Sequence, residues 1–168
     1  MSEARAIVVM GVSGVGKTTV AEALAERLDW TFCDGDRFHP LANVEKMRSG
    51  TPLTDEDRWP WLQAVAAEID RHRRAQKGFI VACSALKRAY RKILMEDRPD
   101  VRLVYLEGDH DLIISRLAHR QGHYFPATLL DSQFATLEKP DAVERAITVI
   151  VDKDVGAVVD EIVAALKR

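Results

Sequence analysis

Residues 11–18 read Gly11-Val12-Ser13-Gly14-Val15-Gly16-Lys17-Thr18 and directly follow the apolar run 6–10. The segment fits the pattern G-x-x-x-x-G-K-[ST], which between a strand and a helix is typical of a phosphate-binding loop. Its glycines let the backbone turn several N–H groups inward, and the helix that follows adds a partly positive N-terminus. A glycine-rich turn without a ligand is the alternative, but the apolar run before the motif favours nucleotide phosphate binding.

The same loop carries the side chains that phosphate chemistry needs. We expect Lys17 to act as a catalytic residue that reaches the outer phosphates of ATP. The Thr18 hydroxyl is placed to ligate Mg²⁺ and is the one direct metal ligand that we predict. The expected ATP-binding residues of this segment are Gly11, Val12, Ser13, Gly14, Val15, Gly16, Lys17, Thr18 and Thr19.

Composition indicates one globular domain over residues 1–168, with 47% apolar and 30% charged residues. The net charge of −2 gives no basic field for nucleic acid or an anionic membrane, and no apolar stretch has the length of a transmembrane helix. The first strand follows the N-terminus too closely for a signal peptide. Cys33 and Cys83 lack zinc spacing and are expected to be free thiols. We therefore expect a cytoplasmic protein without nucleic-acid or membrane partners.

Strand-like runs alternate with helical ones, which predicts an α/β fold with a parallel sheet between layers of helices. Strands are expected at 6–10, 30–33, 79–83, 101–106 and 146–151, and helices at 18–28, 61–76, 109–120 and 155–166. Ligands of such sheets bind beyond the carboxyl ends of the strands. The candidate site segments are therefore 11–18, 34–40, 84–91, 107–111 and 152–154.

An acidic turn, Asp34-Gly35-Asp36, follows the second expected strand. A carboxylate beside a phosphate loop can orient an acceptor hydroxyl, take its proton, or hold a Mg²⁺-bound water. Asp36 is our first choice for this role and Asp34 the second, whereas a solvated Asp-Gly turn is the alternative. His39 lies in the same segment, where contact with a ligand and a structural role are equally open.

Basic residues follow the third and fourth expected strands. If Ser84 begins a helix, Lys87 and Arg91 fall one turn apart and suit an acceptor that carries a carboxylate, although an ordinary basic helix face is equally open. Segment 116–126 combines cations, a glycine and aromatic residues in the manner of a mobile flap. Its closure would bring Arg116 or Arg120 to the phosphates or the adenine.

A helix start is predicted at Thr54, because Thr54 and Asp57 have the spacing of a capping box with Asp in place of Glu. The acids at 55–57 are expected to complement the helix dipole rather than to act in catalysis. Trp59 and Trp61 are interpreted as packing anchors rather than as platforms for a substrate.

With these segments in view, the chain resembles the gluconokinase family of P-loop small-molecule kinases, which is related in fold to shikimate and nucleoside monophosphate kinases. The likeness runs from the first strand to the last helix. Its most specific stretch contains Asp34, Gly35, Asp36, His39, Pro40, Asn43, Lys46, Met47, Gly50, Pro52, Leu53, Asp55, Asp57, Arg58, Pro60, Trp61 and Leu62. Further matches are Cys83, Ser84, Ala85, Leu86, Lys87, Tyr90 and Arg91, then Gly122, His123, Gln133, Phe134, Thr136, Leu137 and Glu138.

The resemblance implies a three-layer αβα kinase fold with a five-stranded parallel sheet in the order 2-3-1-4-5. It also implies an acceptor-binding segment at about 34–62 and a lid at about 116–126. The implied reaction is ATP-dependent phosphorylation of D-gluconate at its 6-hydroxyl, with Mg²⁺, by an enzyme that is commonly a homodimer. The implied substrate-binding residues are Asp36, His39, Lys46, Arg58, Ser84, Lys87, Arg91 and His123.

One departure concerns the metal: Cys83 and Ser84 stand at the end of the third strand, where a second magnesium aspartate would be expected. The role of Asp36 therefore stays open between base and metal support, as does the division of ATP contacts between Arg116 and Arg120. A shikimate kinase would show a glycine triplet after the third strand, and a nucleoside monophosphate kinase would need selectors for a second base. A non-catalytic ATP-binding module would lack an organised acceptor site.

Overall fold

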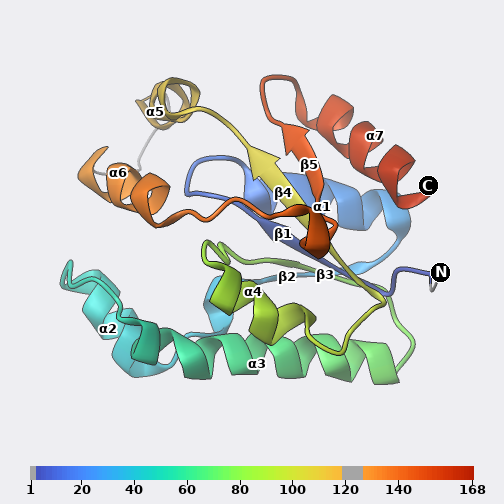
Figure 1. Ribbon diagram of the computed structural model, residues 1–168, viewed down its shortest axis with the longest axis horizontal. Helices are drawn as coiled ribbons and strands as arrows, with labels where there is room; N and C mark the ends of the chain where they lie inside the picture. Colours follow the sequence, from blue (N-terminus) through green and yellow to red (C-terminus); the bar gives the residue numbers. More distant parts are fainter. Residues whose placement is uncertain (1–2, 119–126) are drawn as a thin grey trace.

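The computed structural model describes residues 3–118 and 127–168. In these residues five parallel strands form one sheet in the order β2-β3-β1-β4-β5, with helices on both faces (Figure 1). The strands are β1 (Ala6–Met10), β2 (Thr31–Asp34), β3 (Phe79–Ala82), β4 (Val101–Glu107) and β5 (Ile147–Ile150). The expected three-layer architecture and strand order are confirmed.

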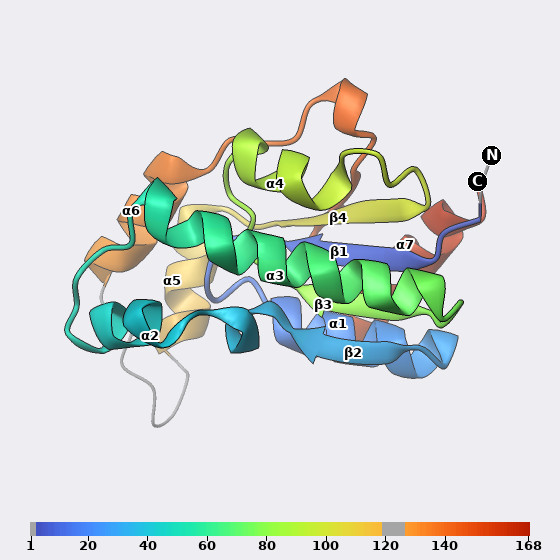
Figure 2. The same ribbon diagram turned by 90° about the horizontal axis from the view of Figure 1, so that it is seen from below.

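The helices form two layers and one cluster at an end of the sheet. They are α1 (Lys17–Leu28), α2 (Leu41–Arg48), α3 (Asp55–Arg74), α4 (Arg88–Met95), α5 (His110–Ala118), α6 (Ala127–Thr136) and α7 (Val155–Leu166), with 3-10 turns η1 (Gly35–Phe38) and η2 (Ala142–Glu144). Helices α1 and α7 cover one face, and α3 and α4 cover the other (Figure 1). Figure 2 shows α2, α5 and α6 together at one end. None of the described helices is long and apolar enough to cross a membrane.

Strand β1 lies at the centre of the sheet and is buried on both faces. Ile7 and Val9 join the core under α1 and α7, whereas Val8 and Met10 join the core under α3 and α4. A strand covered on both sides reads as a continuous apolar run rather than as an alternating pattern. This burial fixes the end of β1, and therefore the start of the phosphate loop, in the middle of the molecule.

Helix α3 begins at Asp55, six residues before the start that apolar periodicity alone predicts. Thr54 and Asp57 form the expected capping box: the Thr54 hydroxyl accepts from the Asp57 N–H (3.1 Å), and the Asp57 carboxylate accepts from the Thr54 N–H (2.9 Å). Pro60 lies inside the helix. The apolar stripe starts only at Trp61, so the first turns are specified by the cap rather than by burial.

Arg91 does not line an open pocket, which corrects its assignment as a substrate residue. Its side chain is 1% exposed, and Nε and Nη2 donate to the Glu144 carboxylate at 2.7 and 3.2 Å. Nη1 donates to the carbonyls of Ala85 (2.9 Å) and Leu86 (3.1 Å). Arg91 therefore ties the loop after β3 to η2 and is committed to the fold.

We expect Arg91→Ala to lower the free energy of unfolding by about 3–5 kcal/mol, because it leaves Glu144 and two carbonyls without their buried partner. Arg88→Ala is the matched control: its side chain is 59% exposed and pairs with Asp141 of the same region at 2.6 Å. That variant should lose less than about 1 kcal/mol. Urea unfolding measures both, and equal losses would contradict the structural role of Arg91.

Candidate active site

The phosphate loop lies between β1 and α1 and has the backbone that an anion nest requires. Gly11, Gly14 and Gly16 adopt φ values of 153°, 85° and 99°. Gly14 also lies against α5, where an added Cβ would come within 3.0 Å of the Leu117 side chain. The loop N–H groups and the N-terminus of α1 suit the phosphates of a nucleotide.

Lys17 is the first residue of α1, and its side chain folds back over the loop. Nζ donates to the carbonyls of Gly11 (2.9 Å) and Val12 (3.0 Å). Desolvation lowers the pKa of Lys17 to about 8, while the carboxylates of Asp36 and Asp34 act in the opposite direction. A partly desolvated cation inside a nest of N–H groups fits a polyphosphate.

The two acids after β2 have different roles. Asp34 accepts from the Asp36 N–H at 2.9 Å and caps η1, which commits that carboxylate to the turn. The Asp36 side chain is 78% exposed and stays open to an approaching molecule. Desolvation by the surrounding protein and repulsion from Asp34 raise the pKa of Asp36, and Lys17 opposes them. Between the acids, a Cβ on Gly35 would lie 2.6 Å from the Ala82 carbonyl, so glycine is needed there.

His39 is held beside Asp36 as a neutral donor. Its ring stacks on Trp61 with centroids 4.2 Å apart, and Nε2 lies 3.9 Å from the Asp36 carboxylate. Asn43 donates from Nδ2 to the Asp57 carbonyl (2.8 Å), so the same amide group donates to His39 Nδ1 (3.2 Å). The proton of His39 is therefore on Nε2. Desolvation lowers the pKa of His39 to about 4, which keeps the ring uncharged at neutral pH.

Two predicted cations from distant segments meet on Tyr90. Arg58 and Lys87 lie over its ring at 5.5 and 5.6 Å from the centroid, and Arg58 donates to the Tyr90 hydroxyl at 3.2 Å. Asp55 pairs with Lys87 (3.2 Å) and accepts from the Tyr90 hydroxyl. We call these four residues the cationic cluster, since two cations and one carboxylate leave one net positive charge. Such a cluster can bind a carboxylate.

Asp55 and Tyr90 are functional candidates that sequence reasoning missed. Asp55 was assigned to the helix dipole, and Tyr90 stood in a matched motif without a role. The hydrogen bond from Tyr90 and the ion pair with Lys87 lower the pKa of the Asp55 carboxyl. The only signal in the sequence was the place of both residues in the motifs that resemble the kinase family.

The other predicted residues are distributed around this centre. Ser84 lies beside the phosphate loop, where its carbonyl accepts from the Gly11 N–H at 3.3 Å. It does not begin a helix, because α4 starts at Arg88 with Lys87 before it. Lys46 pairs with Asp57 at 2.7 Å and joins α2 to α3. Arg116 donates to the Val151 carbonyl, next to the loop after β5.

Two predicted residues, Arg120 and His123, lie outside the described residues, as does most of the expected lid. Thr18 and Thr19 are exposed at the start of α1. Among the described residues, no group of three or more His, Cys, Asp or Glu side chains is placed to hold a metal ion. The Thr18 hydroxyl and the Asp36 carboxylate do offer oxygen donors of the kind Mg²⁺ prefers, so the residues fit a metal that phosphate oxygens also hold.

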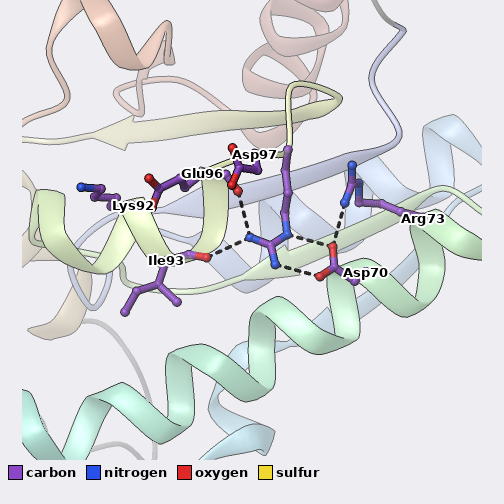
Figure 3. A pocket seen from close by; sticks show the side chains of 7 residues that line it. Asp70, Arg73, Lys92, Ile93, Glu96 and Asp97 are labelled. Carbon is purple, nitrogen blue, oxygen red and sulfur yellow. Dashed lines mark hydrogen bonds and ion pairs between the residues drawn. The ribbon is translucent and has the colours of Figure 1, made fainter.

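A separate pocket of about 370 Å³ lies at the other end of the sheet, next to the start of β4 (Figure 3). Asp70 accepts there from Arg98 at 2.7 and 2.8 Å and from Arg73 at 2.8 Å. Asp100 occupies the remaining donors of Arg73. Asp70, Asp100, Arg73 and Arg98 thus pair with one another, and we assign this group of charges to the fold and not to a ligand.

Comparison with known proteins identifies the family of the chain. A sequence family described as an AAA domain matches residues 7–140. A probable gluconokinase of Xenopus tropicalis is 45% identical over an alignment of 177 positions, which spans 96% of this chain and 93% of that protein.

Among the solved structures that resemble this chain there is also a gluconokinase. A gluconokinase from Sinorhizobium meliloti 1021 is 42% identical and superimposes with a TM-score of 0.89, covering 99% of this chain and 94% of that one. A shikimate kinase from Bacteroides thetaiotaomicron is 18% identical with a TM-score of 0.70 over 97% of this chain and 98% of that one, a likeness of fold alone. Given the identity to gluconokinases over almost the full length of both chains, this chain belongs to the gluconokinase family.

Proposed function

We propose that this chain transfers the γ-phosphoryl group of ATP to the 6-hydroxyl of D-gluconate and releases 6-phospho-D-gluconate and ADP. The observation that carries the proposal is the open Asp36 carboxylate, which is close enough to Lys17 for each to act on the pKa of the other. It also lies 3.9 Å from His39, whose pKa is lowered by desolvation and by Arg58 of the cationic cluster. Family membership supports the same reaction. The proposal includes a Mg²⁺ requirement and a homodimer, which follow from the family resemblance. It also includes a cytoplasmic location, which follows from the composition and the cysteine pattern of the sequence.

At the donor end, the loop N–H groups bind the phosphates of ATP, and Lys17 reaches the outer phosphates. Mg²⁺, held by Thr18 and phosphate oxygens, would neutralise charge on the transferred group. Arg116 lies against the loop after β5 and is proposed to contact the nucleotide, with Arg120 and the rest of segment 116–126 closing over it. Closure would exclude water that would otherwise hydrolyse ATP.

At the acceptor end, Asp36 accepts a hydrogen bond from the 6-hydroxyl, orients its oxygen toward the γ-phosphorus and takes its proton. The raised pKa of Asp36 suits a base that must gain a proton during transfer. His39 offers its Nε2 proton to the same region. The cationic cluster binds the carboxylate at the other end of the sugar acid, so gluconate is held at both ends.

The proposal is tested by ADP release from purified protein with Mg-ATP and D-gluconate, shikimate, a panel of nucleoside monophosphates, or no acceptor. We expect release that depends on D-gluconate. Release that depends only on shikimate or a nucleotide would keep a kinase but overturn the assignment of the acceptor. Binding of ATP without release in any arm would favour a non-catalytic module.

Exchange of the acidic residues tests the division of roles in the acidic turn. Asp36→Asn should lower kcat by about 100-fold to 10,000-fold, because an amide cannot take the hydroxyl proton. Asp34→Asn is the matched control, since its amide oxygen can still accept from the Asp36 N–H. It should retain most activity. Similar losses in both variants, or an active Asp36→Asn enzyme, would remove Asp36 from the role of base.

Removal of one cation tests the carboxylate site. Lys87→Gln should raise KM for D-gluconate by about tenfold to 100-fold, the range of a lost hydrogen bond to a charged group, with a smaller effect on kcat. Lys92→Gln, an exposed change on α4, the helix that follows Lys87, serves as the control and should leave KM unchanged. An unchanged KM in the Lys87 variant would place the carboxylate elsewhere.

The pH profile of kcat/KM for ATP should fall as the pH rises through about 8, where free Lys17 loses its proton. Below this pH the ammonium is charged and attracts the phosphates; above it, that attraction is lost. In kcat the same limb should lie at higher pH, because bound phosphates favour the charged form. In Lys17→Arg the guanidinium stays charged, so the limb should vanish. A limb that persists in this variant would belong to another group.

A further inference from the structure

Gln133 of α6 holds the phosphate loop through a two-point contact. Its Oε1 accepts from the Ser13 backbone N–H at 2.6 Å, and its Nε2 donates to the Ser13 hydroxyl at 2.8 Å. The two residues are 120 positions apart in the sequence. Gln133 stands in a motif that matches the kinase family, but neither the phosphate chemistry nor the acceptor cluster uses it.

The Ser13 N–H belongs to the same peptide group as the Val12 carbonyl, which accepts from Lys17 Nζ at 3.0 Å. This peptide is trans, so its N–H and C=O point in opposite directions. Lys17 therefore binds the carbonyl at one edge of this peptide group, and Gln133 binds the N–H at the opposite edge. Because the N–H points away from the ammonium, Gln133 does not compete with a phosphate that Lys17 binds.

We propose that Gln133 is a positioning residue for Lys17, acting through the Val12–Ser13 peptide. With Gln133 in place, the Val12 carbonyl stays directed at Nζ and fixes the ammonium over the loop. Without it, rotation of the peptide would remove an acceptor from Lys17 and turn an N–H toward the positive charge. The proposal rests on the phosphoryl transfer proposed above.

The position of Gln133 is fixed from the other end of its segment. The Glu138 N–H donates to the Leu86 carbonyl at 2.8 Å, and the Glu138 carboxylate accepts from the Arg88 N–H at 2.7 Å. These contacts anchor the end of α6 to the loop before α4. The segment from Gln133 to Glu138 therefore joins the phosphate loop to the chain on both sides of Lys87 in the cationic cluster.

The test compares Gln133→Met, which keeps the size of the side chain and removes both hydrogen bonds, with two other variants. Ser13→Ala keeps the N–H contact and loses only the hydroxyl. Ser132→Ala changes an exposed neighbour on α6 and is the control. For each variant, kcat, KM for D-gluconate and the melting temperature are measured. The dissociation constants of ADP and of a triphosphate analogue with nitrogen in the β–γ bridge are also measured.

We expect Gln133→Met to lower kcat and to weaken the triphosphate analogue by about tenfold or more. KM for D-gluconate and the melting temperature should stay close to those of the unchanged protein, and ADP should weaken less than the analogue. Ser13→Ala should be milder, because the N–H contact remains. An unchanged kcat and analogue affinity would overturn the proposal. So would equal damage in Ser13→Ala, or a joint loss of stability and of binding for both substrates.

The binding measurements test the role of Gln133 independently of whether D-gluconate is the acceptor. If the unchanged protein releases no ADP with D-gluconate, the proposed acceptor is wrong. The role of Gln133 is then decided by the analogue and ADP alone: selective weakening of the triphosphate supports it, and equal affinities for the variant and the unchanged protein overturn it.

Discussion

A lysine ammonium that is partly removed from water needs oxygen atoms around it, and this need shapes the centre of the molecule. The carbonyls of Gly11 and Val12 supply two of them, so the Lys17 side chain folds back over the loop. The burial of β1 fixes where the loop starts, and α1 fixes where it ends. Desolvation lowers the pKa of Lys17, and the negative charge of a bound polyphosphate would stabilise its charged form.

The second constraint is that parallel strands end on the same edge of the sheet. The turn after β2 therefore brings Asp36 to the Lys17 loop, and the segment after β3 brings Lys87 to the same side. The turn gives its two acids different roles: the Asp34 carboxylate accepts a hydrogen bond from the Asp36 N–H, whereas the Asp36 carboxylate stays open to solvent. A chemical difference between identical side chains thus arises from one hydrogen bond and from the close approach that Gly35 permits.

The parts that local pattern specifies could be predicted: the strands, the phosphate loop, and the capping box at the start of α3. The parts that depend on distant partners could not. The local pattern around Arg91 predicts a surface cation. In the structure Arg91 is buried and pairs with Glu144, which lies 53 positions away and could not be identified as its partner from the sequence. The residues around Gln133 do not indicate its role, because the group that it contacts, Ser13, lies 120 positions away in the sequence. Of the cationic cluster, Arg58 and Lys87 were predicted and Asp55 and Tyr90 were not. The spacing of residues in the sequence does not show that both cations lie over the same tyrosine ring.

In the proposed reaction the open Asp36 carboxylate acts on the terminal hydroxyl of a sugar acid, while the cationic cluster binds the carboxylate at the opposite end. The position of the new phosphate ester tests this most directly. We would record the proton-coupled ³¹P spectrum of the product formed from D-gluconate and Mg-ATP. We expect one phosphomonoester coupled to the two protons of a primary carbon. Coupling to a single proton would place the phosphate on a secondary hydroxyl and contradict the orientation of the substrate between Asp36 and the cationic cluster.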